Sequence, residues 1–190
     1  MATTNQRTVH ALLIAVLLSA PACESRSTTA IEPVYDPLTG KLQLMKSDTN
    51  GNGKVDTVSH MDGTRVLRID IDNDEDGRVD RSEYYDADQH LEKIATSSAN
   101  DGTIDRTEFY EHDALVRAEE DGDGDGKIDK WETYENGRLA SVAFDTVHRG
   151  TPDRRFVYGV DGATRLETDV DGTGHFVAAE TPTPSAGTRR

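Results

Sequence analysis

Acidic residues at matching positions of two short segments are the side chains of this chain whose types and spacing best suit metal-ion coordination. They occupy positions 1, 3, 5, 9 and 12 of a twelve-residue segment, and are Asp72, Asp74, Asp76, Asp80 and Glu83 in one and Asp121, Asp123, Asp125, Asp129 and Glu132 in the other. Carboxylates spaced in this way can converge on one cation, and a glutamate at position 12 can close the site with both oxygens. The backbone carbonyl of position 7, carried by Arg78 and by Lys127, completes the predicted ligand set. Oxygen-only ligation without cysteine or histidine favours a hard cation such as Ca²⁺ over zinc.

A glycine at position 6, Gly77 and Gly126 in the two segments, allows the sharp turn that such a loop needs. With that glycine, both segments read Asp-x-Asp-x-Asp-Gly-x-x-Asp-x-x-Glu, and this pattern resembles the calcium loop of the EF-hand. The resemblance implies bound Ca²⁺ as the cofactor of this protein.

The same twelve-residue segment occurs six times, and we name the copies loops one to six, starting at residues 48, 72, 97, 121, 145 and 169. Loops one and six keep part of the ligand set and are candidate sites: Asp48, Asn50, Asn52 and Asp56 in loop one, which ends in Ser59, and Asp169, Asp171, Thr173 and Glu180 in loop six, which has Val177 at position 9. Loop three has Ser97 and Ala99 at ligand positions, and loop five has Val147 and Arg149, so we interpret both as turns without an ion. We expect this alternation to relieve repulsion between neighbouring carboxylate clusters, with Arg149 as a counter-ion.

The spacing of the loops predicts the architecture that positions them. The position-6 glycines recur every 24 or 25 residues, which indicates an array of six small repeats. About 12 residues separate one loop from the next, too few for two helices, and Asn136-Gly137 in the middle of one such segment is typical of a β-hairpin. The predicted fold is mainly β, an elongated array of six β-hairpin repeats of about 24 residues joined by Asp-rich Ca²⁺ loops. Helical EF-hand pairs remain the alternative, because apolar positions such as Leu91 and Ile94 are three residues apart and do not follow the strict period of a strand.

A second resemblance lies in the hairpin segment itself. The stretch from Trp131 to Leu139, with Tyr134 before the turn and Gly137 in it, resembles the bacterial variant of the MORN repeat and the YD repeat. The resemblance covers residues 34–180 and implies an elongated antiparallel sheet, and it supplies no catalytic residue. Those families carry no Asp-rich loop between hairpins. Each repeat buries few apolar side chains, so we expect stacking and bound ions to stabilise the array.

The first 33 residues predict export and anchoring. The apolar run from Ala11 to Ala20, followed by small residues, is typical of a signal peptide over residues 1–22, and it is too short to span a membrane as a helix. Cys23, the only cysteine, directly follows it and resembles the lipidated cysteine of bacterial lipoproteins; ordinary cleavage that leaves a free thiol is the alternative. We expect residues 23–33 to be the lipidated cysteine and a tether, residues 34–180 the calcium-binding repeat domain, and residues 181–190 a disordered tail. Glu24 is compatible with sorting to the outer membrane in that family.

Composition limits the function. A formal net charge of −15 excludes nucleic acid as a partner, because phosphates would be repelled. No catalytic motif is present, so we expect no enzyme and no catalytic residue. The predicted function is that of a calcium-binding, membrane-anchored envelope lipoprotein with a structural or adhesive role and an unidentified protein or glycan partner. A helical EF-hand sensor that binds its partner on Ca²⁺ loading is the alternative, and an envelope enzyme using bound Ca²⁺ would need an acid–base pair that the chain does not offer.

Overall fold

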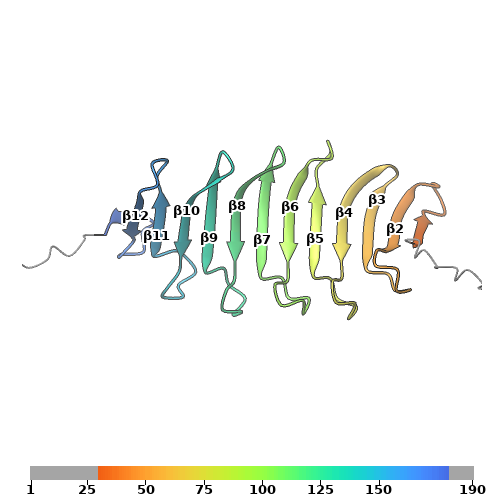
Figure 1. Ribbon diagram of the computed structural model, residues 1–190, viewed down its shortest axis with the longest axis horizontal. Helices are drawn as coiled ribbons and strands as arrows, with labels where there is room; N and C mark the ends of the chain where they lie inside the picture. Colours follow the sequence, from red (N-terminus) through yellow and green to blue (C-terminus); the bar gives the residue numbers. More distant parts are fainter. Residues whose placement is uncertain (1–29, 180–190) are drawn as a thin grey trace, which may run out of the picture.

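A computed structural model of the protein describes residues 30–179, which form a single antiparallel sheet of 13 strands (Figure 1). Each strand pairs with its neighbours in sequence, and the strands are β1 (Ala30–Tyr35), β2 (Leu42–Asp48), β3 (Thr57–Asp62), β4 (Arg65–Ile71), β5 (Arg81–Tyr85), β6 (Leu91–Thr96), β7 (Arg106–Glu111), β8 (Ala114–Glu120), β9 (Lys130–Glu135), β10 (Arg138–Phe144), β11 (Arg154–Tyr158), β12 (Thr164–Thr168) and β13 (Val177–Ala178). The predicted β-hairpin array is confirmed. The helical alternative is not supported, since the described residues contain no helix, and therefore none long and apolar enough to cross a membrane.

Two kinds of connection alternate along the sheet, one at each end of the strands (Figure 1). Tight turns join the two strands of each hairpin, and Asn136 and Gly137, with φ of 50° and 72°, form one of them between β9 and β10. Two successive residues with positive φ match the twist of the flanking strands, which is why Asn-Gly is favoured there. The Asp-rich loops make all the other connections, so the topology places the six loops side by side at one end of the strands.

A β-bulge in every hairpin except β11–β12 accounts for the three-residue apolar spacing. In the β5–β6 hairpin Glu83 faces Ile94 and Tyr84 faces Lys93, but Tyr85 faces Leu91, one residue further than regular pairing allows. The extra residue returns Leu91 to the face that carries Ile94. The same shift occurs in the β3–β4, β7–β8 and β9–β10 hairpins.

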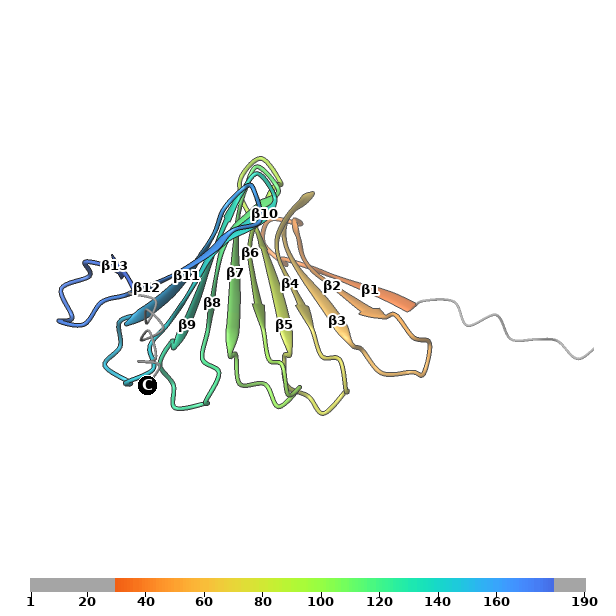
Figure 2. The ribbon, with the colours of Figure 1, turned by 60° about the vertical axis from the view of Figure 1, so that its left-hand side comes forward.

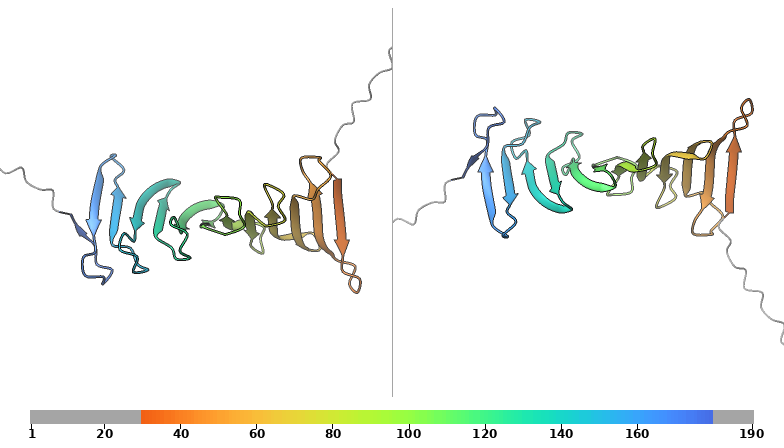
Figure 3. Two further views of the ribbon diagram at one scale, coloured as in Figure 1. Left: turned by 90° about the horizontal axis from the view of Figure 1, so that it is seen from below. Right: turned by 90° about the horizontal axis from the view of Figure 1, so that it is seen from above.

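The sheet is open and has only a thin apolar core. Ile94, Ala118 and Val142 are buried on one face, and Ala95 and Ala143 on the other. The strands fan out in Figure 2 as twist accumulates from one end of the array to the other, and the views from above and below in Figure 3 show the described chain as one layer. With so little apolar surface buried, the polar contacts of loops and strands carry much of the organisation of this fold.

The first strand begins at Ala30, so the sheet starts inside the segment 23–33 that the sequence predicts to be a tether. Pro33 lies on this edge strand, where no further neighbour needs an N–H donor. The predicted signal peptide over residues 1–22, Cys23 and the predicted tail over residues 181–190 lie outside the described residues.

Candidate metal sites in the aspartate-rich loops

Backbone hydrogen bonds connect each Asp-rich loop to the next through the residue at position 9. In loop two the N–H of Asp80 donates to the carbonyl of Ile71 at 2.8 Å, and the carbonyl of Asp80 accepts from the N–H of Ser97, the first residue of loop three, at 2.6 Å. The carbonyl of Asp56 likewise accepts from Asp72 at 2.9 Å. Backbone hydrogen bonds at the ends of the strands therefore hold positions 1 and 9 in place, while positions 2 to 8 form the exposed part of the loop.

Within loop two the carboxylates accept hydrogen bonds from backbone N–H groups of the same loop. Asp72 Oδ2 accepts the N–H of Gly77 at 2.9 Å, Asp74 Oδ1 accepts that of Asp76 at 3.2 Å, and Asp76 Oδ1 accepts that of Arg78 at 2.8 Å. Such side-chain-to-backbone bonds are typical of aspartate turns and direct the chain around a common centre.

Three carboxylates of loop two converge as the sequence predicts. Asp72, Asp74 and Asp80 each place one carboxylate oxygen within 4.8 Å of the others. Asp80 is completely buried, and its Oδ1, like Oδ1 of Asp72, is a buried atom that accepts no hydrogen bond from any described residue. A buried charged acceptor without a partner is costly, and a hard cation among three carboxylates would supply the missing interaction. The residues present in loop two therefore fit a divalent cation.

Loop four repeats the cluster with Asp121, Asp123 and Asp129, whose oxygens also lie within 4.8 Å of one another. Asp129 Oδ2 accepts the backbone N–H groups of Gly122 and Asp123, both at 3.2 Å. This cluster lies closer to solvent than the one in loop two, because Asp129 is only partly buried.

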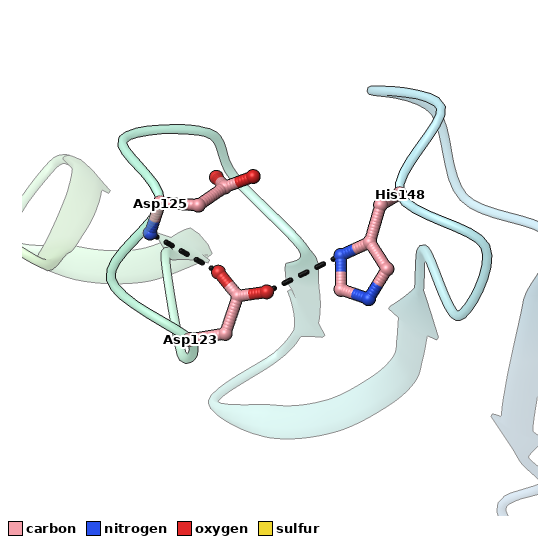
Figure 4. A group of neighbouring side chains, drawn as sticks. All are labelled: Asp123, Asp125 and His148. Atoms are coloured by element: carbon pink, nitrogen blue, oxygen red, sulfur yellow. Dashed lines mark hydrogen bonds and ion pairs between the residues drawn. The ribbon is translucent and has the colours of Figure 1, made fainter.

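A histidine from the neighbouring loop also faces loop four. His148 Nδ1 lies 3.2 Å from Asp123 Oδ2, and Asp125 completes a group of three potential ligand atoms (Figure 4). His148 belongs to loop five, so this contact depends on how adjacent loops stand beside each other. Sequence reasoning misses it, because no spacing within one repeat places His148 near Asp123.

The predicted glutamate ligands at position 12 do not join these clusters. Glu83 accepts from Arg81 Nε and from the Tyr85 hydroxyl, both at 2.9 Å. In an EF-hand a helix returns position 12 to the ion, whereas here the residues after position 9 form a strand, whose three-residue rise of about 10 Å carries the glutamate away along the sheet.

Glu132 has the same arrangement on β9 and a stronger set of partners. Its carboxylate accepts from Arg106 at 2.8 Å, from Lys130 at 2.9 Å and from the Tyr134 hydroxyl at 2.9 Å. Burial alone would raise the pKa of Glu132, but these hydrogen bonds outweigh it and lower the pKa to about 2. Glu132 thus accepts hydrogen bonds from an arginine, a lysine and a tyrosine on the sheet and is not directed toward the aspartates of loop four.

Arg78 and Lys127, whose backbone carbonyls are predicted ligands, pair their side chains with an acidic residue of their own loop. The cationic groups of Arg78 and Lys127 lie 3.6 Å and 3.5 Å from the carboxylates of Asp76 and Asp125. Asp76 therefore has both a backbone and a side-chain partner, and it is not one of the three converging carboxylates of loop two.

The candidate ligands of loop one are engaged by loop two. The side-chain amides of Asn50 and Asn52 donate to Glu75 Oε1 at 2.6 Å and 2.5 Å, and Lys54 lies 3.3 Å from Glu75 Oε2. The amide nitrogens of loop one thus bond to a carboxylate of the neighbouring repeat. The amide oxygens of Asn50 and Asn52, which are the atoms that would ligate a cation, accept the backbone N–H groups of Asn52 and Lys54 at 3.0 Å and 2.9 Å. Asp48 accepts loop backbone N–H groups, that of Gly53 at 2.7 Å among them.

In loop six, Arg149 acts as the expected counter-ion from loop five. Its guanidinium lies 3.1 Å from Asp169 Oδ2, and Asp169 is 2% exposed. Asp171 Oδ1 accepts from the N–H and hydroxyl of Thr173, at 3.1 Å and 2.8 Å. Glu180 lies outside the described residues. The first ligand of loop six is therefore paired with a cationic side chain.

Comparison with known proteins gives little further guidance. No family model matches the chain, and no curated protein matches it. A similar solved structure is that of accessory secretory proteins 1, 2 and 3 from Streptococcus pneumoniae, with a TM-score of 0.33 and 13% sequence identity over 62% of this chain. The chain spans 19% of the length of that protein. A TM-score this low establishes neither a shared fold nor a shared function.

Proposed function

We propose that this protein binds calcium ions in loops two and four and that the ions stabilise its repeat array. The observation that carries the proposal is the pair of buried, bare carboxylate oxygens of Asp72 and Asp80 beside the carboxylate of Asp74. Such a centre is unfavourable unless a cation occupies it. Loop four offers the same aspartates at the same positions.

Calcium suits these loops better than magnesium or zinc. The side chains that converge within each loop are carboxylates, with His148 of loop five as a neighbour of Asp123 in loop four, and Ca²⁺ accepts six to eight oxygens in irregular geometry, including carbonyls and water. Magnesium requires a near-ideal octahedron, and zinc favours nitrogen and sulfur ligands. In exposed modules of this kind, Kd values of about 10⁻⁴–10⁻³ M are usual. At extracellular calcium concentrations such sites are occupied continuously and stabilise the structure instead of switching it.

The proposed biological role is structural or adhesive and not catalytic. The signal-like residues 1–22 and Cys23 support export and lipid anchoring in a bacterial envelope, with the outer membrane as the favoured location. An elongated, acidic sheet held by ions would serve as a spacer or as a docking surface for a protein or glycan partner. Incorporation of labelled fatty acid into the full chain, and its loss in Cys23→Ser, tests the anchoring.

Isothermal titration of the full chain with Ca²⁺ tests the central proposal. We expect two bound ions in the wild type and none in the double variant Asp80→Asn, Asp129→Asn. Circular dichroism of both proteins provides the folding control. A wild-type chain that takes up no Ca²⁺ and melts at the same temperature in calcium and in chelator would refute the proposal.

A further inference from the structure

In loops one to five, which have an aspartate at position 9, the residue at position 2 determines what surrounds that aspartate. In loop three Ser98 donates its N–H to Asp105 Oδ2 at 2.9 Å and its hydroxyl to Oδ1 at 2.7 Å. In loop five Thr146 donates its N–H to Asp153 Oδ1 at 2.6 Å and its hydroxyl to Oδ2 at 2.8 Å. One residue therefore occupies both oxygens of each carboxylate.

Loop one is closed in a related way. Thr49 donates both its N–H and its hydroxyl to Asp56 Oδ2, at 2.9 Å and 2.8 Å, and the Thr57 hydroxyl donates to Oδ1 at 2.8 Å. The carboxylate of Asp56 is thus as fully hydrogen-bonded as those of loops three and five, although loop one retains a candidate ligand at positions 1, 3, 5 and 9.

Loops two and four lack the hydroxyl. Asn73 donates only its N–H to the position-9 carboxylate, at Asp80 Oδ2 and 2.8 Å, and Oδ1 remains buried and bare among the described residues. Gly122 has no side chain, and its N–H reaches Asp129 Oδ2 at 3.2 Å. The two loops whose carboxylates converge are therefore the two in which position 2 offers Asn or Gly.

We infer that a hydroxyl at position 2 takes the place of the cation at the position-9 carboxylate, so that this carboxylate is closed by Thr or Ser in loops one, three and five and only loops two and four accept an ion. Loop five tests the rule most closely, because Oδ1 of its first residue, Asp145, is buried without a hydrogen-bond partner while Thr146 closes Asp153. This inference rests on the proposed calcium binding and specifies which loops perform it. Each hydroxyl hydrogen bond occupies a lone-pair site of the carboxylate and satisfies part of its charge, so a cation gains less from that carboxylate and a closed loop binds more weakly. The residues concerned are Thr49, Ser98 and Thr146.

The arrangement also sets the spacing of the ions. Loops two and four are four strands apart, which corresponds to about 19 Å at the usual separation of neighbouring strands. That distance is roughly two Debye lengths at physiological ionic strength. The closed loop between them keeps two clusters of converging carboxylates from lying side by side.

The substitution Asn73→Thr tests the inference, because it adds the hydroxyl to loop two without removing a carboxylate. The matched control is Asn73→Val, because valine has the shape of threonine without its hydroxyl. Both variants lose the 3.2 Å hydrogen bond from the Asn73 amide to Asn100, and Asn73 has no positive φ that would strain a β-branched residue. By calorimetry of the full chain we expect two ions for the wild type and for Asn73→Val. For Asn73→Thr we expect one ion at full affinity and the loop-two site weakened roughly tenfold to hundredfold.

The loop-four ion in each variant shows that the sheet is folded. Two ions bound to Asn73→Thr with wild-type affinity would overturn the inference and leave the proposed calcium binding intact. Loss of the loop-two ion in Asn73→Val as well would overturn it too, since the hydroxyl would not be the cause. A wild-type chain that binds three or more ions would show that closed loops bind. A wild-type chain that binds none would overturn the inference together with the proposed function.

Discussion

Replacing Asp80 with asparagine separates the two roles that its carboxylate has in loop two. The side chain is completely buried, its Oδ2 accepts the N–H of Asn73 at 2.8 Å, and its Oδ1 is bare. Asparagine keeps an oxygen for Asn73 and places an amide donor where the bare oxygen stands. It also removes one negative charge beside Asp72 and Asp74, so Asp80→Asn removes a calcium ligand and relieves an unfavourable group in the same step.

The expected magnitudes follow from mass action. With about 10 mM Ca²⁺ and a Kd of about 10⁻⁴–10⁻³ M, one site adds about 1.4–2.7 kcal/mol to the free energy of unfolding. For a domain of this size that corresponds to a rise in Tm of about 3–10 °C per site. Asp80→Asn should lose the contribution of loop two in calcium. In chelator it should be as stable as the wild type or more stable by about 1–3 kcal/mol, because a bare buried acceptor has been removed.

Thermal melting followed by circular dichroism, in calcium and in chelator, measures both effects. The control is Asp153→Asn in loop five, where both carboxylate oxygens accept hydrogen bonds from Thr146. That variant should melt earlier in both conditions by a similar amount, and its gain in Tm on adding calcium should equal that of the wild type. If Asp80→Asn kept the full wild-type gain, loop two would hold no ion. If it were destabilised in chelator as much as Asp153→Asn, the cost assigned to the bare oxygen would be refuted.

Three further perturbations test the fold around the sites. Because the pKa of Glu132 is lowered from 4.5 to about 2 in the folded state, its contribution to the free energy of unfolding is present above pH 4.5 and is lost as the pH falls from there to about 2; urea unfolding should show this loss, and Glu132→Gln should flatten it. Gly137→Val should lower the free energy of unfolding in urea by about 1–2 kcal/mol, because a β-branched residue would be forced to a φ of 72°, and an equally stable variant would contradict the assigned turn. Arg149→Gln leaves the buried Asp169 carboxylate without its cation at a cost of about 2 kcal/mol, so hydrogen exchange of the amides of β12 should accelerate, and unchanged exchange would show that the pair has no structural role.

Most of the architecture can be predicted from local features of the chain. A glycine every 24 or 25 residues indicates the repeat, and Asn136-Gly137 with alternating residues on both sides indicates a hairpin. The spacing of Leu91 and Ile94 leaves helix and strand open, because a bulge and a helical turn both bring residues three apart to one face. Only the pairing of β5 with β6 identifies the bulge.

The candidate site is predictable only in part. The converging aspartates of loops two and four belong to the same short segment, so their spacing alone is enough to bring them together. The EF-hand resemblance predicts that Glu83 and Glu132 close the sites, because in an EF-hand a helix follows the loop. Here a strand follows, and the two glutamates accept hydrogen bonds from arginine and tyrosine side chains on the sheet. The contacts of Glu75 with loop one and of His148 with loop four cross between repeats, where spacing within one repeat carries no information.

The sequence by itself determined the period, the strand and turn content and the identity of the aspartates that could bind a cation, because turn geometry and ligand chemistry depend on residues a few positions apart. Tertiary structure decided how many hydrogen bonds each of those aspartates accepts. That outcome depends on the hydrogen bonds that reach each carboxylate, from Thr49 to Asp56 in a closed loop and from Asn73 alone to Asp80 in an open one. Backbone hydrogen bonds at the strand ends fix positions 1 and 9, and burial leaves Oδ1 of Asp72 and Oδ1 of Asp80 without a protein partner, which is where the proposed cation would bind.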